Sequence, residues 1–159
     1  MHVLFLGKGN DCRTLLAEAV FNHLAPPGCT ARRASCDHAG PPDPAALRLL
    51  AKQGIQPALE TAESPRDSPS ESDVLITVCS VAAEQACPCC RPDALSAHWG
   101  VHRPARHKGF SSRSDHELLD LYHILRARIE RLLVLVQAGI ETDRPRLQRE
   151  LARIGRYLP

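Results

Sequence analysis

A glycine-rich turn near the start of the chain has the residues of an anion-binding loop. It consists of Gly7, Lys8, Gly9, Asn10, Asp11, Cys12 and Arg13. A turn of this kind that enters a helix points backbone N–H groups at one spot and adds the helix dipole. Arg13 supplies a guanidinium fork that binds an oxyanion through two parallel hydrogen bonds. The turn predicts an oxyanion cradle, although a plain strand-to-helix turn explains the glycines equally well.

The cysteines are the second group of residues with chemical potential. Their number is seven, and an odd count excludes a complete internal disulfide framework. Reduced thiols in a cytosolic protein bind metals, take part in redox chemistry or fill core positions. We interpret Cys29 and Cys36, which flank an expected strand, as small buried apolar residues. Cys36 remains an outside candidate because parallel sheets place their sites at the carboxyl ends of strands.

Length and charge limit the classes of partner. The 159 residues suit one domain, 1–159, without a linker or an internal repeat. A net charge of +2 and 4% aromatic residues favour neither nucleic acid nor a membrane surface as partner. No apolar run is long enough to span a bilayer, and the first residues lack the basic region of a signal peptide. We therefore expect a cytoplasmic protein.

Strand and helix patterns alternate along the chain and must position these residues. Val3–Leu6 and Val74–Val78 are apolar runs typical of buried parallel strands. Thr30–Ser35 and Ala94–Trp99 are weaker strand candidates, and two arginines make the former less buried. The alternation indicates an α/β fold with a parallel sheet that is covered on both faces.

Start and stop signals bound the helices. They are Pro26-Pro27 after the first helix, Asp43-Pro44 and Gly54 around the second, the capping box Ser114–Glu117 and Gly139 around the third, and Asp143 before the fourth. The third helix carries Arg126, Arg128 and Arg131, which we interpret as a solvated face.

Three blocks resemble the thioredoxin-coupled arsenate reductases of the low-molecular-weight phosphatase superfamily. The first, LFLGKGNDCRTLLAE, resembles their strand, C-T-G-N-S-C-R-S loop and helix, with matches at Gly9, Asn10, Cys12, Arg13 and Glu18. DVLITVCSVAAEQACP resembles D-x-V-I-T-V-C…E-x-C-P, and HWGVHRPARHKG resembles H-W-x-x-x-D-P-A-x-x-x-G. The resemblance implies a flavodoxin-like three-layer sandwich, with a parallel sheet of about four strands and helices on both faces.

The resemblance also implies a mechanism. In the family, a thiolate at the first loop position attacks arsenate, and the aspartate of D-P-A protonates the leaving oxygen. Two further cysteines then form a disulfide that thioredoxin reduces. Cys79 and Cys87 match these relay cysteines, and Cys12 matches an extra loop cysteine of many members. The site is expected at the carboxyl ends of the strands, between the loop and the segment 79–90.

The chain departs from the family at both chemical positions. Gly7 stands at the place of the nucleophile and has no side chain that could attack. Arg103 stands at the place of the acid, and arginine stays protonated in proteins. Asp11 adds a negative charge near the cradle, which Lys8 partly offsets. Standard arsenate reductase or tyrosine phosphatase activity is therefore predicted to be absent or impaired.

Three functional hypotheses follow. The first is an atypical arsenate-reductase-like protein that uses its remaining thiols for metal, arsenite or redox chemistry, with candidate ligands Cys12, Cys79, Cys87, Cys89 and Cys90. Against it stands the interpretation of these cysteines as inherited remnants without a ligand. The second is an active reductase or phosphatase with Cys12 as nucleophile, Arg13 on the oxyanion, and Cys79 and Cys87 as relay. The third is a regulatory pseudoenzyme that acts by protein interaction.

The expected partners follow from these hypotheses. They are thioredoxin or another thiol reductant, and a small oxyanion or a soft metal ion. The expected cofactor is a thiophilic metal ion or arsenite, if any is bound. Neither nucleic acid nor a membrane is expected as a partner.

Overall fold

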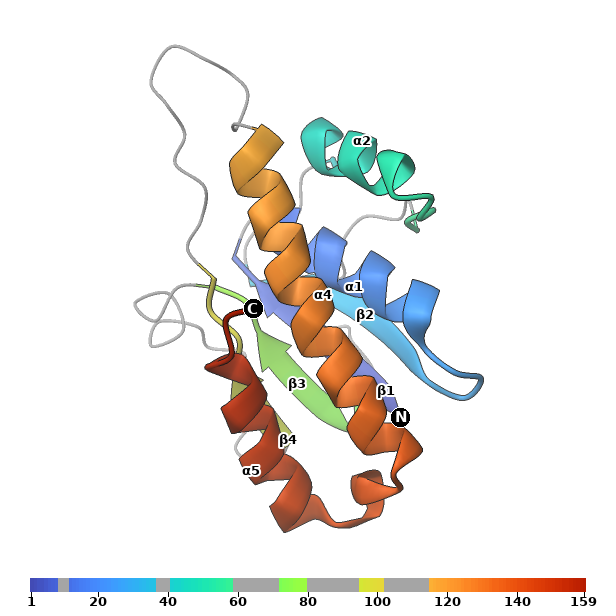
Figure 1. Cartoon of the computed structure of the whole chain (residues 1–159), viewed down its shortest axis with the longest axis vertical. Coiled ribbons are helices and arrows are strands. Elements are labelled where there is room, and N and C mark those ends of the chain that lie inside the picture. The colour runs from blue at the N-terminus through green and yellow to red at the C-terminus, as the bar shows by residue number, and fades with distance from the viewer. Residues whose placement is uncertain (9–11, 37–40, 59–71, 80–94, 102–114) are drawn as a thin grey trace.

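The computed structural model describes residues 1–8, 12–36, 41–58, 72–79, 95–101 and 115–159. Its four strands are β1 (His2–Gly7), β2 (Thr30–Ser35), β3 (Val74–Thr77) and β4 (Leu95–His98). They form one parallel sheet in the order β2-β1-β3-β4 (Figure 1). The chain therefore moves outward in opposite directions from β1 and β3, and sheets of this type bind ligands beyond the carboxyl ends of the strands at such a point.

Helices pack together on one face of the sheet (Figure 1). They are α1 (Cys12–Leu24), α2 (Pro44–Lys52), α4 (Asp115–Gln137) and α5 (Arg144–Gly155), with the short 3-10 helix η1 (Ile140–Thr142) before α5. Apolar residues of these four α-helices join one core cluster with Val3, Phe5 and Ile76 of the sheet. None of them is long and apolar enough to cross a membrane, as far as the described chain goes. The flavodoxin-like α/β class predicted from the sequence is confirmed.

The opposite face of the sheet carries a smaller cluster. It consists of Leu4, Leu6, Ala34 and Leu75, with Cys36 packed against it. The alternation along β1 explains the two clusters, because successive side chains of a strand point to opposite faces. The described helices all contribute to the larger cluster, so helices of the expected third layer are not among the residues that the structure describes.

The helix ends agree with the capping signals in the sequence. The Asp43 side chain accepts a hydrogen bond from the Ala45 amide (2.8 Å), and Asp143 accepts one from the Arg146 amide (3.0 Å). These bonds satisfy amides that have no partner within the helix. Gly139, which follows α4, has a φ of 72°, a left-handed conformation that glycine adopts without strain.

Two buried side chains tie the end of β4 to the C-terminal part of the chain. The Trp99 indole donates to the Leu151 carbonyl (3.1 Å), and Arg128 donates to the carbonyls of Trp99 (2.9 Å) and Tyr157 (3.0 Å). Burial lowers the pKa of the Arg128 guanidinium from its ordinary value. The sequence predicted that Arg128 lies on a solvated face of its helix. This prediction is wrong, because the Arg128 guanidinium points into the protein and donates to two backbone carbonyls.

Gly155 at the end of α5 packs directly on the same segment. A β-carbon at this position would lie 2.8 Å from Cδ1 of Trp99 and closer still to the carbonyl oxygen of His98. Alanine favours a helix over glycine by about 0.5–1 kcal/mol, but overpacking costs about 1–3 kcal/mol. We expect Gly155→Ala to lower the free energy of unfolding by roughly 1–2 kcal/mol in urea titrations. Arg149→Ala, at an exposed position of α5, is the control; a stabilising Gly155→Ala would contradict the close contact.

Candidate functional site

Gly7 is the last residue of β1 and lies at the carboxyl edge of the sheet. It pairs in register with Ser35 of β2, and its carbonyl accepts a hydrogen bond from the Cys36 amide (3.0 Å). Lys8, which follows, is exposed. Gly9, Asn10 and Asp11 lie outside the described residues, so the cradle itself stays a prediction.

Cys12 and Arg13 open helix α1 beyond this edge. Cys12 is 0% exposed and belongs to the main core cluster. Arg13 is also buried, and its Nη1 donates to the Val101 carbonyl at 3.0 Å. A guanidinium has five N–H donors, so this bond anchors Arg13 to the segment after β4 and leaves further donors for other acceptors. The start of α1 is thereby held against the carboxyl ends of the strands.

Cys79 follows β3 at the same edge. Its neighbour Val78 donates a backbone hydrogen bond to the Leu6 carbonyl (2.9 Å), which extends the pairing between β1 and β3. The Cys79 side chain is 2% exposed. Since β1 and β3 are adjacent, Cys79 lies beyond the strand next to the one that ends at Gly7.

Strand β4 ends at His98, and Trp99 directly follows it. The ring Nδ1 of His98 lies 2.8 Å from the Thr77 hydroxyl, and the buried Trp99 packs in the core. A β-carbon at Gly100 would collide with the His98 ring. Packing against Thr77 and Gly100 therefore explains this histidine.

Cys36 and Cys29 have different roles. Cys29 carries a thiol and packs half-buried against the main core, in agreement with the prediction. Cys36 is disulfide-bonded. The interpretation of Cys36 as a mere apolar residue is therefore wrong. The sequence contained one signal for a role of Cys36: it directly follows β2, and parallel sheets place their sites at the carboxyl ends of the strands.

The described residues do not contain a complete metal site. No group of three or more His, Cys, Asp or Glu side chains in that part of the chain could hold a metal ion. Cys12 and Cys79 both carry thiols. Cys87, Cys89 and Cys90 lie outside the described residues, so the full thiol set of the sequence prediction stays a prediction.

Comparison with known proteins decides the family. Residues 2–153 match the family model described as low molecular weight phosphotyrosine protein phosphatase. The chain belongs to this phosphatase family. No curated protein matches the chain. The family assignment agrees with the resemblance of the three sequence blocks.

Solved structures of the phosphatase family share this fold. An arsenate reductase from Archaeoglobus fulgidus has a TM-score of 0.68 at 24% identity, over 82% of this chain and 98% of that one. A thioredoxin-dependent arsenate reductase from Corynebacterium glutamicum has a TM-score of 0.63 at 20% identity, over 87% of this chain and 62% of that one. An arginine phosphatase from Geobacillus stearothermophilus has a TM-score of 0.63 at 15% identity, over 87% and 94%.

A buried ion pair joins strand β2 to helix α1, the helix of this phosphatase-family domain that begins at Cys12 and Arg13. Arg33 of β2 donates to the carboxylate of Glu18 on α1, and also to the Ala58 carbonyl (3.3 Å). The expectation that arginines make β2 less buried is therefore wrong for Arg33, because Glu18 compensates its charge inside the protein. Sequence analysis missed this pair, whose members are 15 residues apart.

Proposed function

We propose that this member of the phosphatase family is an atypical arsenate-reductase-like protein that uses its remaining thiols for metal, arsenite or redox chemistry. The observation that carries the proposal is the placement of cysteines around the carboxyl edge of the sheet. Cys36 follows β2, Cys79 follows β3, and Cys12 opens α1 after β1. At the end of β1 itself stands Gly7, which offers no nucleophile.

Thiol ligation suits these buried positions. A buried thiolate is costly unless a cation or another electrophilic centre compensates its charge. Arsenite provides such a centre, because each As–O bond is exchanged for an As–S bond while the thiol proton leaves with the oxygen as water. Zinc and copper(I) also prefer sulfur, and each thiol that binds them releases its proton. Cys12 and Cys79 are the described ligands of this proposal, and Cys87, Cys89 and Cys90 are its further candidates.

The burial of Cys12 does not separate thiol ligation from an active reductase, because arsenite, zinc and arsenate all arrive from solvent and Cys12 has no exposed surface. The disulfide at Cys36 supports a redox component. The dependence of the Corynebacterium relative on thioredoxin supports a thiol reductant as partner. A reducing compartment such as the cytoplasm fits the thiols at Cys12, Cys29 and Cys79.

Thiol titration on protein purified without oxygen tests the proposal. We expect arsenite or zinc to remove thiols from reaction with a colorimetric disulfide reagent, and metal analysis to find a bound ion in protein that was never exposed to chelators. Cys12→Ser and Cys79→Ser should each weaken the complex more than about 100-fold, since loss of even outer partners costs 10–100-fold in metal sites. Cys29→Ser is the matched control, because Cys29 precedes β2 at the opposite edge.

The same preparation separates the alternatives. An unchanged thiol count with both ions, together with no bound metal, would exclude thiol ligation. Arsenate turnover with thioredoxin that Cys12→Ser abolishes would establish the rewired reductase instead. If the protein neither binds an ion through its thiols nor turns over arsenate, regulation by protein interaction is the remaining hypothesis for its function.

A further inference from the structure

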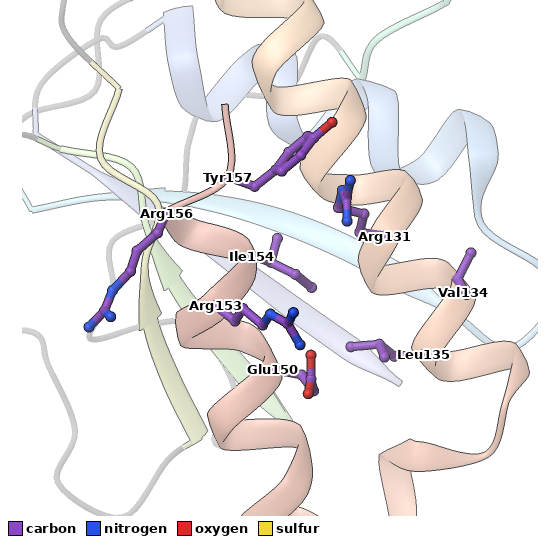
Figure 2. A pocket seen from close by; sticks show the side chains of 8 residues that line it. All are labelled: Arg131, Val134, Leu135, Glu150, Arg153, Ile154, Arg156 and Tyr157. Carbon is purple, nitrogen blue, oxygen red and sulfur yellow. The ribbon is translucent and has the colours of Figure 1, made fainter. Parts of the chain in front are cut away.

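A groove lies between helices α4 and α5. Its volume is about 650 Å³, and residues of both helices and of the C-terminal segment line it (Figure 2). The apolar part of the lining consists of Val134, Leu135, Ile154 and Tyr157. This volume falls in the range of cavities that hold a ligand of many atoms (about 300–1,000 Å³), so the groove has room for several apolar side chains.

One large apolar side chain that lines this groove, and another that directly follows a lining residue in the sequence, are exposed to solvent. Val134, which lines the groove, is 61% exposed, and Leu158, which directly follows the lining residue Tyr157, is 67% exposed. They are the large hydrophobic side chains that the described residues expose to solvent. Exposed apolar surface at a groove marks an interaction site more often than isolated surface leucines do.

The charged residues of the groove define the partner. Arg131 and Arg153 extend into the space between the two helices together with a single acid, Glu150, whereas the Arg156 side chain points away from α4 (Figure 2). The guanidinium carbon of Arg131 lies 3.6 Å from the centre of the Tyr157 ring, a cation–π contact that holds this wall in place. Arginine and tyrosine dominate the binding energy of many protein interfaces. A partner that covers this surface must therefore combine apolar anchors with negative charge.

We propose that the α4–α5 groove binds an acidic amphipathic segment of a partner protein. The apolar side chains of the segment lie on Val134 and Leu135, and its carboxylates pair with Arg131 and Arg153. The geometry is that of an amphipathic helix laid into a groove between two helices. This function is independent of the thiols, and it gives the phosphatase-family scaffold a binding role.

Fluorescence anisotropy with a defined probe tests the proposal. The probe is a labelled peptide of about 15 residues, with Leu and Phe on one helical face and Glu and Asp on the other. We expect Arg131→Glu/Arg153→Glu to weaken its binding at least about tenfold, with binding that also falls as salt is raised. Arg146→Glu/Arg149→Glu is the matched control, because it changes the same charge on exposed positions of α5 outside the groove and should alter affinity less than about twofold.

Other outcomes overturn the proposal. Absence of probe binding at low salt contradicts it, as does equal weakening by the two double variants, which would show an unspecific charge effect. Equal binding of a peptide with serine in place of Leu and Phe would show a site for polyanions. Sedimentation that finds a dimer sensitive to Arg131→Glu/Arg153→Glu would make a second copy of the chain the occupant instead.

Discussion

Gly7→Cys combined with Arg103→Asp is expected to raise the hydrolysis of para-nitrophenyl phosphate at least about 100-fold above the rate of the unaltered protein. The substitutions supply the two groups that the proposed function regards as missing. Gly7 ends β1 at the carboxyl edge, and α1 begins soon after it at Cys12. A thiol at position 7 would therefore lie between the sheet and the start of a helix, where the dipole favours the thiolate.

The two positions contribute different parts of this gain. The thiolate introduced by Gly7→Cys would attack phosphorus, and the carboxyl group introduced by Arg103→Asp would protonate the leaving phenolate, a step usually worth about 10²–10⁴-fold. Gly7→Cys alone should therefore show a lower rate than the double variant. Gly7→Ser with Arg103→Asp is the control, because a serine hydroxyl without a base is a poor nucleophile. Position 103 lies outside the described residues, so this pair also tests the resemblance itself.

Two results would contradict this prediction. A double variant that folds but stays inactive would show that the turn around Asp11 no longer cradles an oxyanion. Activity in the unaltered protein that is lost in Cys12→Ser would show that the catalytic thiol has moved to position 12. Circular dichroism of each variant confirms that the fold is retained before rates are compared.

Glu18→Gln and Arg33→Met should each lower the free energy of unfolding by about 3–5 kcal/mol. Both residues are buried: Glu18 is 8% exposed and Arg33 is 6% exposed. Their side chains form an ion pair between α1 and β2. Glu18→Gln leaves the charge of Arg33 without a compensating charge inside the protein. Arg33→Met leaves the carboxylate of Glu18 uncompensated and also removes the donors of the Ala58 carbonyl. This loss is a large part of the 5–15 kcal/mol that stabilises a typical domain.

A double variant that replaces both partners by apolar residues makes this second prediction specific. Glu18→Leu/Arg33→Met should recover much of the loss, because apolar residues of similar volume replace a buried pair with little penalty. Urea unfolding can be followed by the fluorescence of Trp99, the single tryptophan, which is fully buried. Glu130→Ala is the control: its exposed pair with Arg126 should contribute less than about 1 kcal/mol. A loss below this value in Glu18→Gln would contradict the buried pair.

The sequence by itself determined the family, the strand and helix order and most element boundaries. Apolar runs such as Val74–Thr77 form buried strands, and the caps at Asp43 and Asp143 satisfy amides only two or three residues away. Such signals involve residues only a few positions apart, so they can be recognised in the sequence without knowledge of the fold. The three sequence blocks, spread over most of the chain, pointed to the family that the 2–153 match shows.

The tertiary structure decided what depends on pairings between distant residues. Arg13 reaches a carbonyl 88 residues away, and Trp99 one that is 52 residues away. Arg128 was expected on a solvated face, and Arg33 was expected to make its strand less buried, because charged side chains rarely enter a core. Each meets acceptors inside the protein that local patterns do not reveal. The disulfide at Cys36 and the α4–α5 groove likewise depend on which elements become neighbours. Periodicity and capping determine the elements, whereas the burial of charge follows only from the order β2-β1-β3-β4 and the packing of helices on it.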